Sequence, residues 1–451
     1  YCITSIHASQ NDSQQTLAQQ AKTQLIDRIL GRKASASQQP VAGARLAPRS
    51  SVDPALTRFD RHPGYEKMLV PKAVADRLGL DNPFFRIHEG MAGATSHIAG
   101  REFINFSSYN YLGLSGHPEV NQAAKDAIDH YGTSASASRL VAGERPIQRE
   151  LEQALAAVYG VEDSIVFVSG HATNVSTIGY LFGPKDLVLH DSLIHNSVLQ
   201  GIELSGAARR PFAHNDLTAL DQILAESRGR FERVLIVVEG HYSMDGDIPD
   251  LPALIDIKRR HQAFLMVDEA HSLGVLGEGG KGLHEHYGVD GREVDIWMGT
   301  LSKTLAGCGG YIAGERALVE HLKYAAPGFV YSVGIAPALA AASLAALRVM
   351  QKEPERVQKL QHNTRFFLQQ ARAAGLDIGM SQGHSIIPLM TGSSIKAAKL
   401  SSQLFEHGIN VQPILHPAVE EKAARLRFFL SSEHSQAQIE FSIQTIQELT
   451  S

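Results

Sequence analysis

The sequence lacks the features that mark several large classes of protein. Its 451 residues include only two cysteines, Cys2 and Cys308, which are too few and too far apart for a disulfide framework and fit a cytoplasmic protein. No apolar run reaches the roughly 18 residues of a membrane span. The net charge of −5 gives no reason to expect nucleic acid or an anionic membrane as a partner. Neither H-E-x-x-H nor C-x-x-C occurs, and we expect no metal ion.

The length and composition are those of a globular chain with more than one domain, since 43% of the residues are apolar and 20% are charged. Apolar residues recur at helical spacing over residues 13–30, which predicts an amphipathic helix. Residues 34–58 have the Ser, Ala, Gln and Pro content of a linker. We interpret residues 1–58 as this helix and linker, the remnant of an upstream module of a longer polypeptide or of a processed precursor.

Short apolar strands alternate with helical stretches through the middle of the chain. The expected strands are residues 164–168, 187–190, 234–239, 264–268, 296–299 and 310–313. This alternation predicts an α/β fold with a mostly parallel, buried central sheet flanked by helices. The expected divisions are an N-terminal segment at 59–106, a large domain at 107–345 and a smaller α+β domain at 346–451.

A lysine and an aspartate follow two of the expected strands. Lys303 lies in Gly299-Thr300-Leu301-Ser302-Lys303, and the strand at 264–268 ends in Asp268, with His271 three residues later. A lone loop lysine carries little information. A lysine that forms a Schiff base and an acid that keeps a pyridine nitrogen protonated are, however, the two groups that a pyridoxal phosphate (PLP) site needs. Because ligands of open α/β sheets bind at strand ends, the pattern predicts a PLP site.

A phosphate site is predicted where Ser169-Gly170-His171 follows the strand at 164–168 and opens a helix. Exposed amides and the positive end of the helix dipole suit a phosphate there. Taken alone, this segment is as well explained as an ordinary turn. Together with the lysine and the acid it becomes the expected phosphate site, with Thr300 and Ser302 beside it.

Three other residues have both a structural and a functional interpretation. His195 follows the strand at 187–190, and a lone histidine is more often structural than catalytic, but an imidazole here would stack on the pyridine ring. Ser243 would donate to the ring hydroxyl, or simply belong to a turn. In the structural interpretation Arg427 is solvated or paired with an acid. In the functional one it holds a substrate carboxylate through two hydrogen bonds.

Together these stretches resemble the α-oxoamine synthase family of PLP-dependent acyltransferases, which includes aminooxononanoate synthase and serine palmitoyltransferase. The likeness runs in order from about Phe84 to Leu430. The matching stretches include Asn110-Tyr111-Leu112-Gly113, Ser169-Gly170, His195, Ser243-Met244-Asp245-Gly246, Asp268-Glu269-Ala270-His271, Gly299-Thr300-Leu301-Ser302-Lys303 and Arg425-Leu426-Arg427. The resemblance implies the PLP-dependent transferase fold type I and a homodimer with active sites at the subunit interface.

The resemblance also implies a role for each matched residue. Lys303 would bind the cofactor and remove the α-proton of the substrate, Asp268 would pair with the ring nitrogen, and His195 would stack on the ring. His271 and Ser243 would contact its phenolic oxygen. The implied phosphate ligands are Gly170, His171 and Thr300, with Ser332 from the partner subunit. The implied ligands of the substrate carboxylate are Asn110 and Arg427.

The implied reaction is a decarboxylative condensation of glycine, alanine or serine with an acyl thioester, which gives an α-aminoketone and carbon dioxide. A fold type I aminotransferase is the alternative, since it would use the same lysine and aspartate with a keto acid as second substrate. The run Ser134-Ala135-Ser136-Ala137-Ser138 departs from the Gly-Ser-Gly of many members. It is similar to family domains fused behind acyl carrier or polyketide synthase modules, so an acyl carrier protein is an expected donor beside acyl-CoA.

Overall fold

The computed structural model of the protein describes residues 51–451. The helix expected at 13–30 therefore lies outside the described residues. The chain divides into two compact units, Tyr1–Val74 and Ala75–Ser451. The described N-terminal elements are two 3-10 helices, η1 (Pro54–Thr57) and η2 (Phe59–Arg61), and the helix α2 (Pro63–Arg77). None of the residues of α2 is buried.

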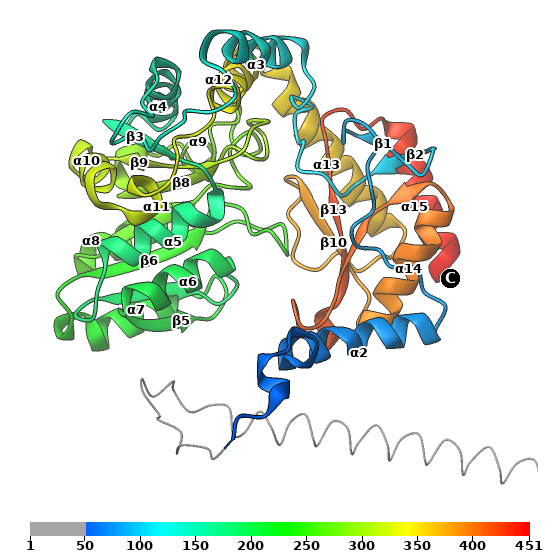
Figure 1. The fold of residues 1–451 in the computed structure, drawn as a ribbon. Coiled ribbons are helices and arrows are strands. Elements are labelled where there is room, and N and C mark those ends of the chain that lie inside the picture. Colours follow the sequence, from blue (N-terminus) through cyan, green and yellow to red (C-terminus); the bar gives the residue numbers. More distant parts are fainter. Residues whose placement is uncertain (1–50) are drawn as a thin grey trace, which may run out of the picture. The chain divides into compact units, whose positions relative to one another are not determined.

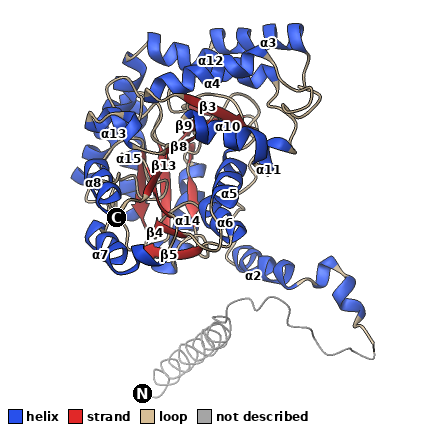
Figure 2. Ribbon diagram, turned by 90° about the vertical axis from the view of Figure 1, so that its left-hand side faces the viewer, coloured by secondary structure: helices blue, strands red, loops and turns tan. Residues whose placement is uncertain are grey.

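A seven-stranded sheet is the largest element of the second unit (Figures 1 and 2). Its strand order is β3-β9-β8-β7-β6-β4-β5. The neighbours from β8 to β5 pair in parallel, and β9 runs antiparallel to both β3 and β8. The strands are β3 (Asp163–Phe167), β4 (Leu187–Asp191), β5 (Ala208–Phe212), β6 (Val234–Glu239), β7 (Phe264–Asp268), β8 (Ile296–Thr300) and β9 (Gly310–Gly314). The expected mostly parallel central sheet is confirmed.

The central strands are apolar on both faces because each face packs on its own hydrophobic core. In β6, Val234, Ile236 and Val238 belong to one core, whereas Leu235 and Val237 belong to the other. Period-two alternation sends neighbouring side chains to opposite faces, so a strand covered on both sides has no polar positions. This explains why these strands could be recognised as continuous apolar runs.

Helices supply the other half of both cores. On one face these are α5 (Gly170–Leu181), α6 (Asn196–Ser205), α10 (Arg316–Ala325) and α11 (Pro327–Val330). The other core draws on α3 (Pro118–Tyr131), α4 (Pro146–Tyr159), α7 (Leu217–Ser227), α8 (Leu251–His261), α9 (Leu283–Tyr287) and α12 (Pro337–Lys352). No helix within residues 51–451 is long and apolar enough to cross a membrane.

The C-terminal part is built on an antiparallel sheet of order β10-β13-β12. Its strands are β10 (Ile386–Met390), β12 (Gln412–Ile414) and β13 (Arg425–Phe429), and its helices are α13 (Glu355–Ala373), α14 (Ser394–Glu406) and α15 (Gln436–Thr450). A second small sheet joins the hairpin β1 (Thr95–Ile98) and β2 (Arg101–Asn105) to β11 (Ile409–Asn410). The hairpin thus pairs with a C-terminal strand, although more than 300 residues separate them.

Candidate active site

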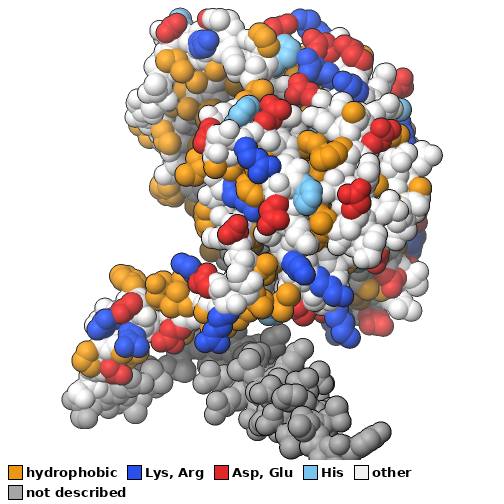
Figure 3. All heavy atoms as spheres, turned by 90° about the vertical axis from the view of Figure 1, so that its right-hand side faces the viewer, with side chains coloured by type: hydrophobic (Ala, Val, Ile, Leu, Met, Phe, Trp, Pro, Cys, Tyr) orange, Lys and Arg blue, Asp and Glu red, His pale blue; other side chains and the backbone are white. Residues whose placement is uncertain are grey.

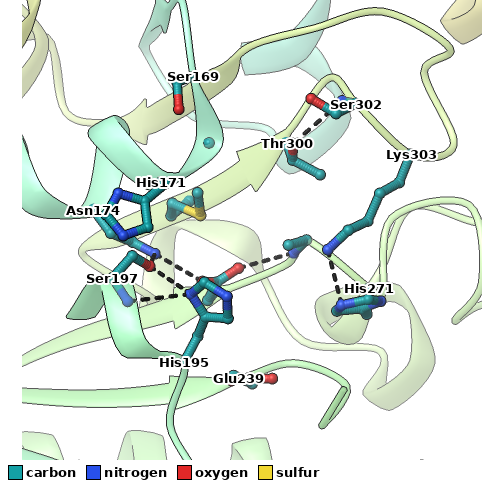
Figure 4. Close-up of a pocket in the computed structure, with 14 residues that line it drawn as sticks. Ser169, His171, Asn174, His195, Ser197, Glu239, His271, Thr300, Ser302 and Lys303 are labelled. Atoms are coloured by element: carbon teal, nitrogen blue, oxygen red, sulfur yellow. Dashed lines mark hydrogen bonds between the residues drawn. The ribbon is translucent and has the colours of Figure 1, made fainter. Parts of the chain in front are cut away.

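A cavity of about 250 Å³ lies at the carboxyl ends of β3, β6, β7 and β8 (Figure 4). Its lining residues are Ser169, Gly170, His171, Asn174, His195, Ser197, Glu239, Asp268, Ala270, His271, Met298, Thr300, Ser302 and Lys303. Of the predicted site residues, the cavity brings together Ser169, Gly170, His171, His195, Asp268, His271, Thr300 and Lys303. These residues come from strand ends that are far apart in the sequence and adjacent in the sheet.

Lys303 reaches into the cavity from the loop after β8 (Figure 4). Burial lowers the pKa of its amine to about 8, although the charges of Asp268 and Glu239 oppose this shift. Its Nζ lies 2.8 Å from Nε2 of His271 and 5.2 Å from the centre of the Tyr109 ring. An amine with this pKa is partly neutral near pH 7, as a nucleophile or general base must be.

Asp268 ends β7, and two hydrogen bonds hold its carboxylate. Its Oδ2 accepts a hydrogen bond of 2.9 Å from Asn174 Nδ2, and its Oδ1 accepts one of 3.0 Å from the amide of Ala270. Asn174 Nδ2 also donates to Ser197 Oγ, which lies 2.7 Å from Nδ1 of His195. A chain of hydrogen bonds therefore runs from the carboxylate of Asp268 to the imidazole of His195 and fixes their relative positions.

His271 connects Lys303 to a buried tyrosine. Its Nδ1 lies 2.7 Å from the hydroxyl of Tyr111, and burial together with the charge of Lys303 lowers the pKa of His271 well below its usual value. Burial raises the pKa of Tyr111, so its hydroxyl remains protonated and donates to Nδ1. This arrangement holds when the Lys303 amine is neutral, and Nε2–H then donates to it. A protonated Lys303 can only donate, so Nε2 then accepts from Nζ and Nδ1–H donates to Tyr111.

The predicted phosphate site has the geometry of a narrow cup. Ser169 caps the N-terminus of α5, where its side chain accepts a hydrogen bond from the amide of Ala172. A Cβ on Gly170 would lie 3.0 Å from Oγ1 of Thr300, so a larger side chain would crowd the cup. Oγ1 of Thr300 accepts from the amide of Ser302. An anion is suited to this place by the amides at the start of α5, by the space beside Gly170 and by the hydroxyls of Ser169 and Thr300.

Asn110 and Ser332 were predicted in the site but do not line this cavity. Asn110 is held by its own loop, because its Oδ1 accepts from the amide of Ser115 and its Nδ2 donates to the carbonyl of Ser115. Ser332 lines a separate small cavity together with Arg139 and Phe329. A role for Ser332 in the cofactor site therefore requires the site of another subunit.

Ser243 and Arg427 also lie outside the lining, and Ser243 contacts it through Glu239. The amide of Ser243 donates to Glu239, and its carbonyl accepts a 3.1 Å hydrogen bond from Nη1 of Arg427. The Arg427 guanidinium lies 4.6 Å from the centre of the Phe429 ring, and that ring is nearly parallel to His271. Nε of Arg427 is buried and has no hydrogen-bond partner among residues 51–451. Arg427 thus retains the donor capacity that a substrate carboxylate would use.

Glu239 is a lining residue that the sequence analysis did not assign. It ends β6 at the position paired with Asp268 on β7. Burial and the charge of Asp268 raise the pKa of Glu239 to about 8. Its Oε2 accepts from Ser243, whereas its Oε1 is buried without a partner. The sequence contained a signal for Glu239, since the strand expected at 234–239 ends in this acid. An acid at the end of a strand is, however, equally well explained as a solvated side chain. Asn174, Ser197 and Tyr111 were also missed, because nothing local marks them.

The sequence matches the model of the family "aminotransferase class I and II" over residues 101–446. The 8-amino-7-oxononanoate synthase of Fervidobacterium nodosum is 39% identical over 367 residues, which cover 81% of this chain and 92% of that protein. The enzyme of the same name from Symbiobacterium thermophilum is 41% identical, over 76% of this chain and 88% of that one. The chain belongs to the α-oxoamine synthase family.

Solved structures agree with this α-oxoamine synthase assignment. Serine palmitoyltransferase from Sphingomonas wittichii superposes with a TM-score of 0.82 at 29% identity, over 86% of this chain and 97% of that one. A structure of serine palmitoyltransferase with PLP as internal aldimine gives 0.81 at 28% identity, with 85% and 97% coverage. The chain is therefore a PLP-dependent acyltransferase of fold type I.

The cavity of this α-oxoamine synthase fits PLP on its own geometry. Asp268 would supply a buried carboxylate for the ring nitrogen, and the half-buried Lys303 would supply an amine with a lowered pKa. The cup at Gly170 and Thr300 supplies the anion site. The imidazole of His195 lines the same cavity (Figure 4).

Proposed function

We propose that the protein condenses a small amino acid, namely glycine, alanine or serine, with an acyl thioester. The carboxyl group of the amino acid leaves as carbon dioxide, the thiol is released, and an α-aminoketone is formed. The observation that carries this proposal is the amine of Lys303, with its lowered pKa, beside the neutral His271 in a cavity that Asp268 also lines. The names of the relatives, 8-amino-7-oxononanoate synthase and serine palmitoyltransferase, support the same reaction class.

The residues of the chain have separate tasks in this reaction. Bound PLP supplies an electron-withdrawing ring that makes a carbanion at the α-carbon accessible near neutral pH. Asp268 holds a positive charge on the ring nitrogen, and Asn174 and Ala270 fix the direction of its carboxylate. Lys303, with a pKa of about 8, takes the α-proton as a general base.

His271 and Arg427 act on the substrates. With Tyr111 donating to Nδ1, the Nε2–H of His271 is available to the thioester oxygen as negative charge develops on it. Arg427 has an unpartnered Nε and binds the substrate carboxylate until it leaves. Asn110 would assist Arg427 only if its loop rearranged, because its amide is engaged with the backbone of Ser115.

The second substrate separates this proposal from an aminotransferase. An aminotransferase returns the amino group to a keto acid and keeps the carboxyl group, whereas the condensation releases carbon dioxide only when a thioester is present. We therefore expect labelled carbon dioxide from carboxyl-labelled glycine, alanine or serine with acyl-CoA or acyl carrier protein, and none without a thioester. Formation of a new amino acid from a keto acid, without release of labelled carbon dioxide, would favour the aminotransferase.

We further propose a homodimer in which Ser332 contributes to the partner's phosphate site. This proposal rests on the separation of Ser332 from the cavity of its own chain. Sedimentation of the purified protein should give a mass near twice 48.9 kDa. Mixing a Lys303→Ala chain with a Ser332→Trp chain should restore part of the activity if sites are shared. A monomer that is fully active would contradict the proposal. A cytoplasmic location and the identity of the natural thioester carrier stay predictions.

A further inference from the structure

A buried ion cluster lies beside the cavity, on strands that the proposed mechanism does not use directly. His214, in the loop after β5, is placed between Asp191 at the end of β4 and Asp247 in the loop after β6. His214 Nδ1 lies 2.9 Å from Asp191 Oδ1, and its Nε2 lies 2.7 Å from Asp247 Oδ2. The side chain of Asp191 is completely buried, and those of Asp247 and His214 are only 6% and 13% exposed.

The geometry of this cluster requires a charged imidazole. Each ring nitrogen faces a carboxylate oxygen, and a carboxylate can only accept, so both nitrogens must carry a hydrogen. Burial opposes the charged form, but the hydrogen bonds from Asp191 and Asp247 outweigh it and raise the pKa of His214 to about 10. The ring of Tyr242 packs edge-on against His214 and helps to cover it. His214 is therefore a permanent cation at neutral pH and joins two strand-end loops.

A second bridge runs parallel to the first. The amide of Asn215 donates to Asp191 Oδ2 at 2.8 Å, and its Nδ2 donates to Asp247 Oδ2 at 2.9 Å. To make both bonds, Asn215 adopts a positive φ of 54°, which asparagine tolerates better than most residues. Two adjacent residues thus hold the same pair of carboxylates.

Each of the two aspartates in turn makes hydrogen bonds within a loop that carries a predicted site residue. Asp191 Oδ1 accepts from the amide of Leu193, and the carbonyl of Asp191 accepts from the amide of Ile194. These bonds turn the chain directly before His195, which caps α6. The carbonyl of Asp247 accepts from the amide of Tyr242 and closes the loop that contains Ser243.

We propose that His214 is a positioning residue of the cofactor site, which ties the loop of His195 to the loop of Ser243 and so fixes the His195 ring and the carbonyl that anchors Arg427. This inference rests on the proposed function, because the His195 ring matters only if a cofactor ring lies beside it. His214 itself does not line the cavity and contacts neither substrate nor cofactor there.

The experiment compares His214→Gln with a matched control, Lys258→Met. Lys258 pairs with Asp295 at 2.8 Å and is similarly shielded from solvent. This pair lies at the other end of the strands, where β8 begins. The readouts are the dissociation constant of PLP, the visible circular dichroism of the bound cofactor and the melting temperature. For His214→Gln we expect the dissociation constant to rise about tenfold, the change that loss of one charge-assisted hydrogen bond produces, and the dichroism to fall. For Lys258→Met we expect a lower melting temperature with both cofactor readouts unchanged.

A double-mutant cycle tests whether His214 acts through His195. In the His195→Ala background, His214→Gln should change the PLP dissociation constant by less than about twofold, because the ring that it positions is gone. Additive effects in the cycle, or unaltered dichroism in His214→Gln despite a lower melting temperature, would overturn the proposal. If His214→Gln does not fold, Asp247→Asn weakens one side of the bridge and should shift the same readouts in the same direction by less. Failure of the wild-type protein to bind PLP would instead contradict the proposed function.

Discussion

Charged side chains are paired differently at the two ends of the strands in the seven-stranded sheet. We call these ends the amino edge and the carboxyl edge. At the amino edge, where β3 and β8 begin, Asp163 pairs with Arg149 at 2.7 Å and Asp295 pairs with Lys258 at 2.8 Å. At the carboxyl edge, Glu239 and Asp268 occupy paired positions on β6 and β7. Glu239 retains a buried oxygen without a partner, whereas neither Asp163 nor Asp295 has such an atom in the described chain.

This difference separates residues that stabilise the fold from residues that are available for catalysis. Ion pairs at the amino edge satisfy each other and leave nothing for a ligand. At the carboxyl edge, pKa values of two groups converge, since burial lowers that of Lys303 and raises that of Glu239, both to about 8. Converging pKa values of an acid and a base in one cavity are typical of an active site. Substitutions at the carboxyl edge should therefore reduce activity more than stability, and those at the amino edge the reverse.

The largest effect is expected from Lys303→Ala. Removal of the amine removes both the covalent attachment of the cofactor and the general base, so the rate should fall at least about 10⁴-fold. Borohydride treatment of the wild-type protein with PLP should give a pyridoxyl-labelled peptide that contains residue 303, and the variant should give none. Lysine 281, in an exposed loop position, offers a control, since Lys281→Ala should label as the wild type does.

Asp268→Asn should have the next largest effect. The amide keeps the size of the side chain but cannot stabilise a positive charge on the ring nitrogen, so we expect kcat to fall about 100-fold or more. PLP should still bind, because the amine and the phosphate cup remain. Absorption spectra would show bound cofactor together with loss of the α-proton exchange that NMR measures in deuterated buffer. Wild-type exchange in this variant would remove Asp268 from the mechanism.

The arginines of β13 provide a comparison within one strand. Arg425 is paired with Asp245 at 2.6 Å, whereas Arg427 has a buried Nε without a partner. Arg427→Lys should raise KM for the amino acid about 10- to 100-fold, because two charged hydrogen bonds become one, and leave the unfolding free energy nearly unchanged. Arg425→Lys should lower the unfolding free energy with little change in KM. The opposite pattern would show that Arg427 is the structural residue.

The pKa of Lys303 predicts how pH affects cofactor capture. Only the neutral amine attacks the aldehyde of PLP, and burial lowers the pKa of this amine to about 8. The rate of capture by the cofactor-free protein should therefore rise about tenfold between pH 7 and pH 9 and then level off. Stopped-flow absorbance measures this rate. A rate that continued to rise steeply beyond pH 10 would indicate a normal, exposed lysine.

The smallest effect on activity is expected at the amino edge. Lys258→Met removes the partner of Asp295, which also accepts from the amide of Leu265 at the start of β7. The unfolding free energy should fall by about 1–3 kcal/mol, because a shielded carboxylate loses its cation. Urea denaturation measures this change, and the specific activity below the transition should stay within about twofold of the wild type. A large loss of activity would break the distinction between the two edges.

The sequence predicted the parts of the fold that follow local rules. The strands at 234–239 and 264–268 were placed correctly because they are apolar on both faces. The strand β5 was missed because Ala208-Arg209-Arg210-Pro211-Phe212 lies at an edge and has exposed polar positions. The short strands β11 and β12 follow each other closely in the sequence but belong to different sheets. Pairing partners, unlike apolar runs, depend on the tertiary fold.

The candidate site was predicted to a similar extent. Residues with a chemical signature at a strand end, such as Lys303 and Asp268, were found. Residues that act through geometry were not, since the hydrogen bonds of Asn174 to Asp268 and of Tyr111 to His271 join segments 94 and 160 residues apart. Asn110 and Ser332 were placed in the site by resemblance, and the structure of a single chain leaves them outside its cavity.

The missed strand β5 has one more consequence, for colloidal behaviour. Among the described residues 51–451, β5 is the last strand of its sheet, and no further strand pairs with its outer backbone groups. In other proteins such an edge templates intermolecular strand addition. Pro211 lacks an amide hydrogen, and Arg209 and Arg210 are exposed and carry charge of one sign. A neighbouring molecule that approached edge to edge would meet a missing donor and two like charges, so we expect this short strand to disfavour aggregation of the concentrated protein.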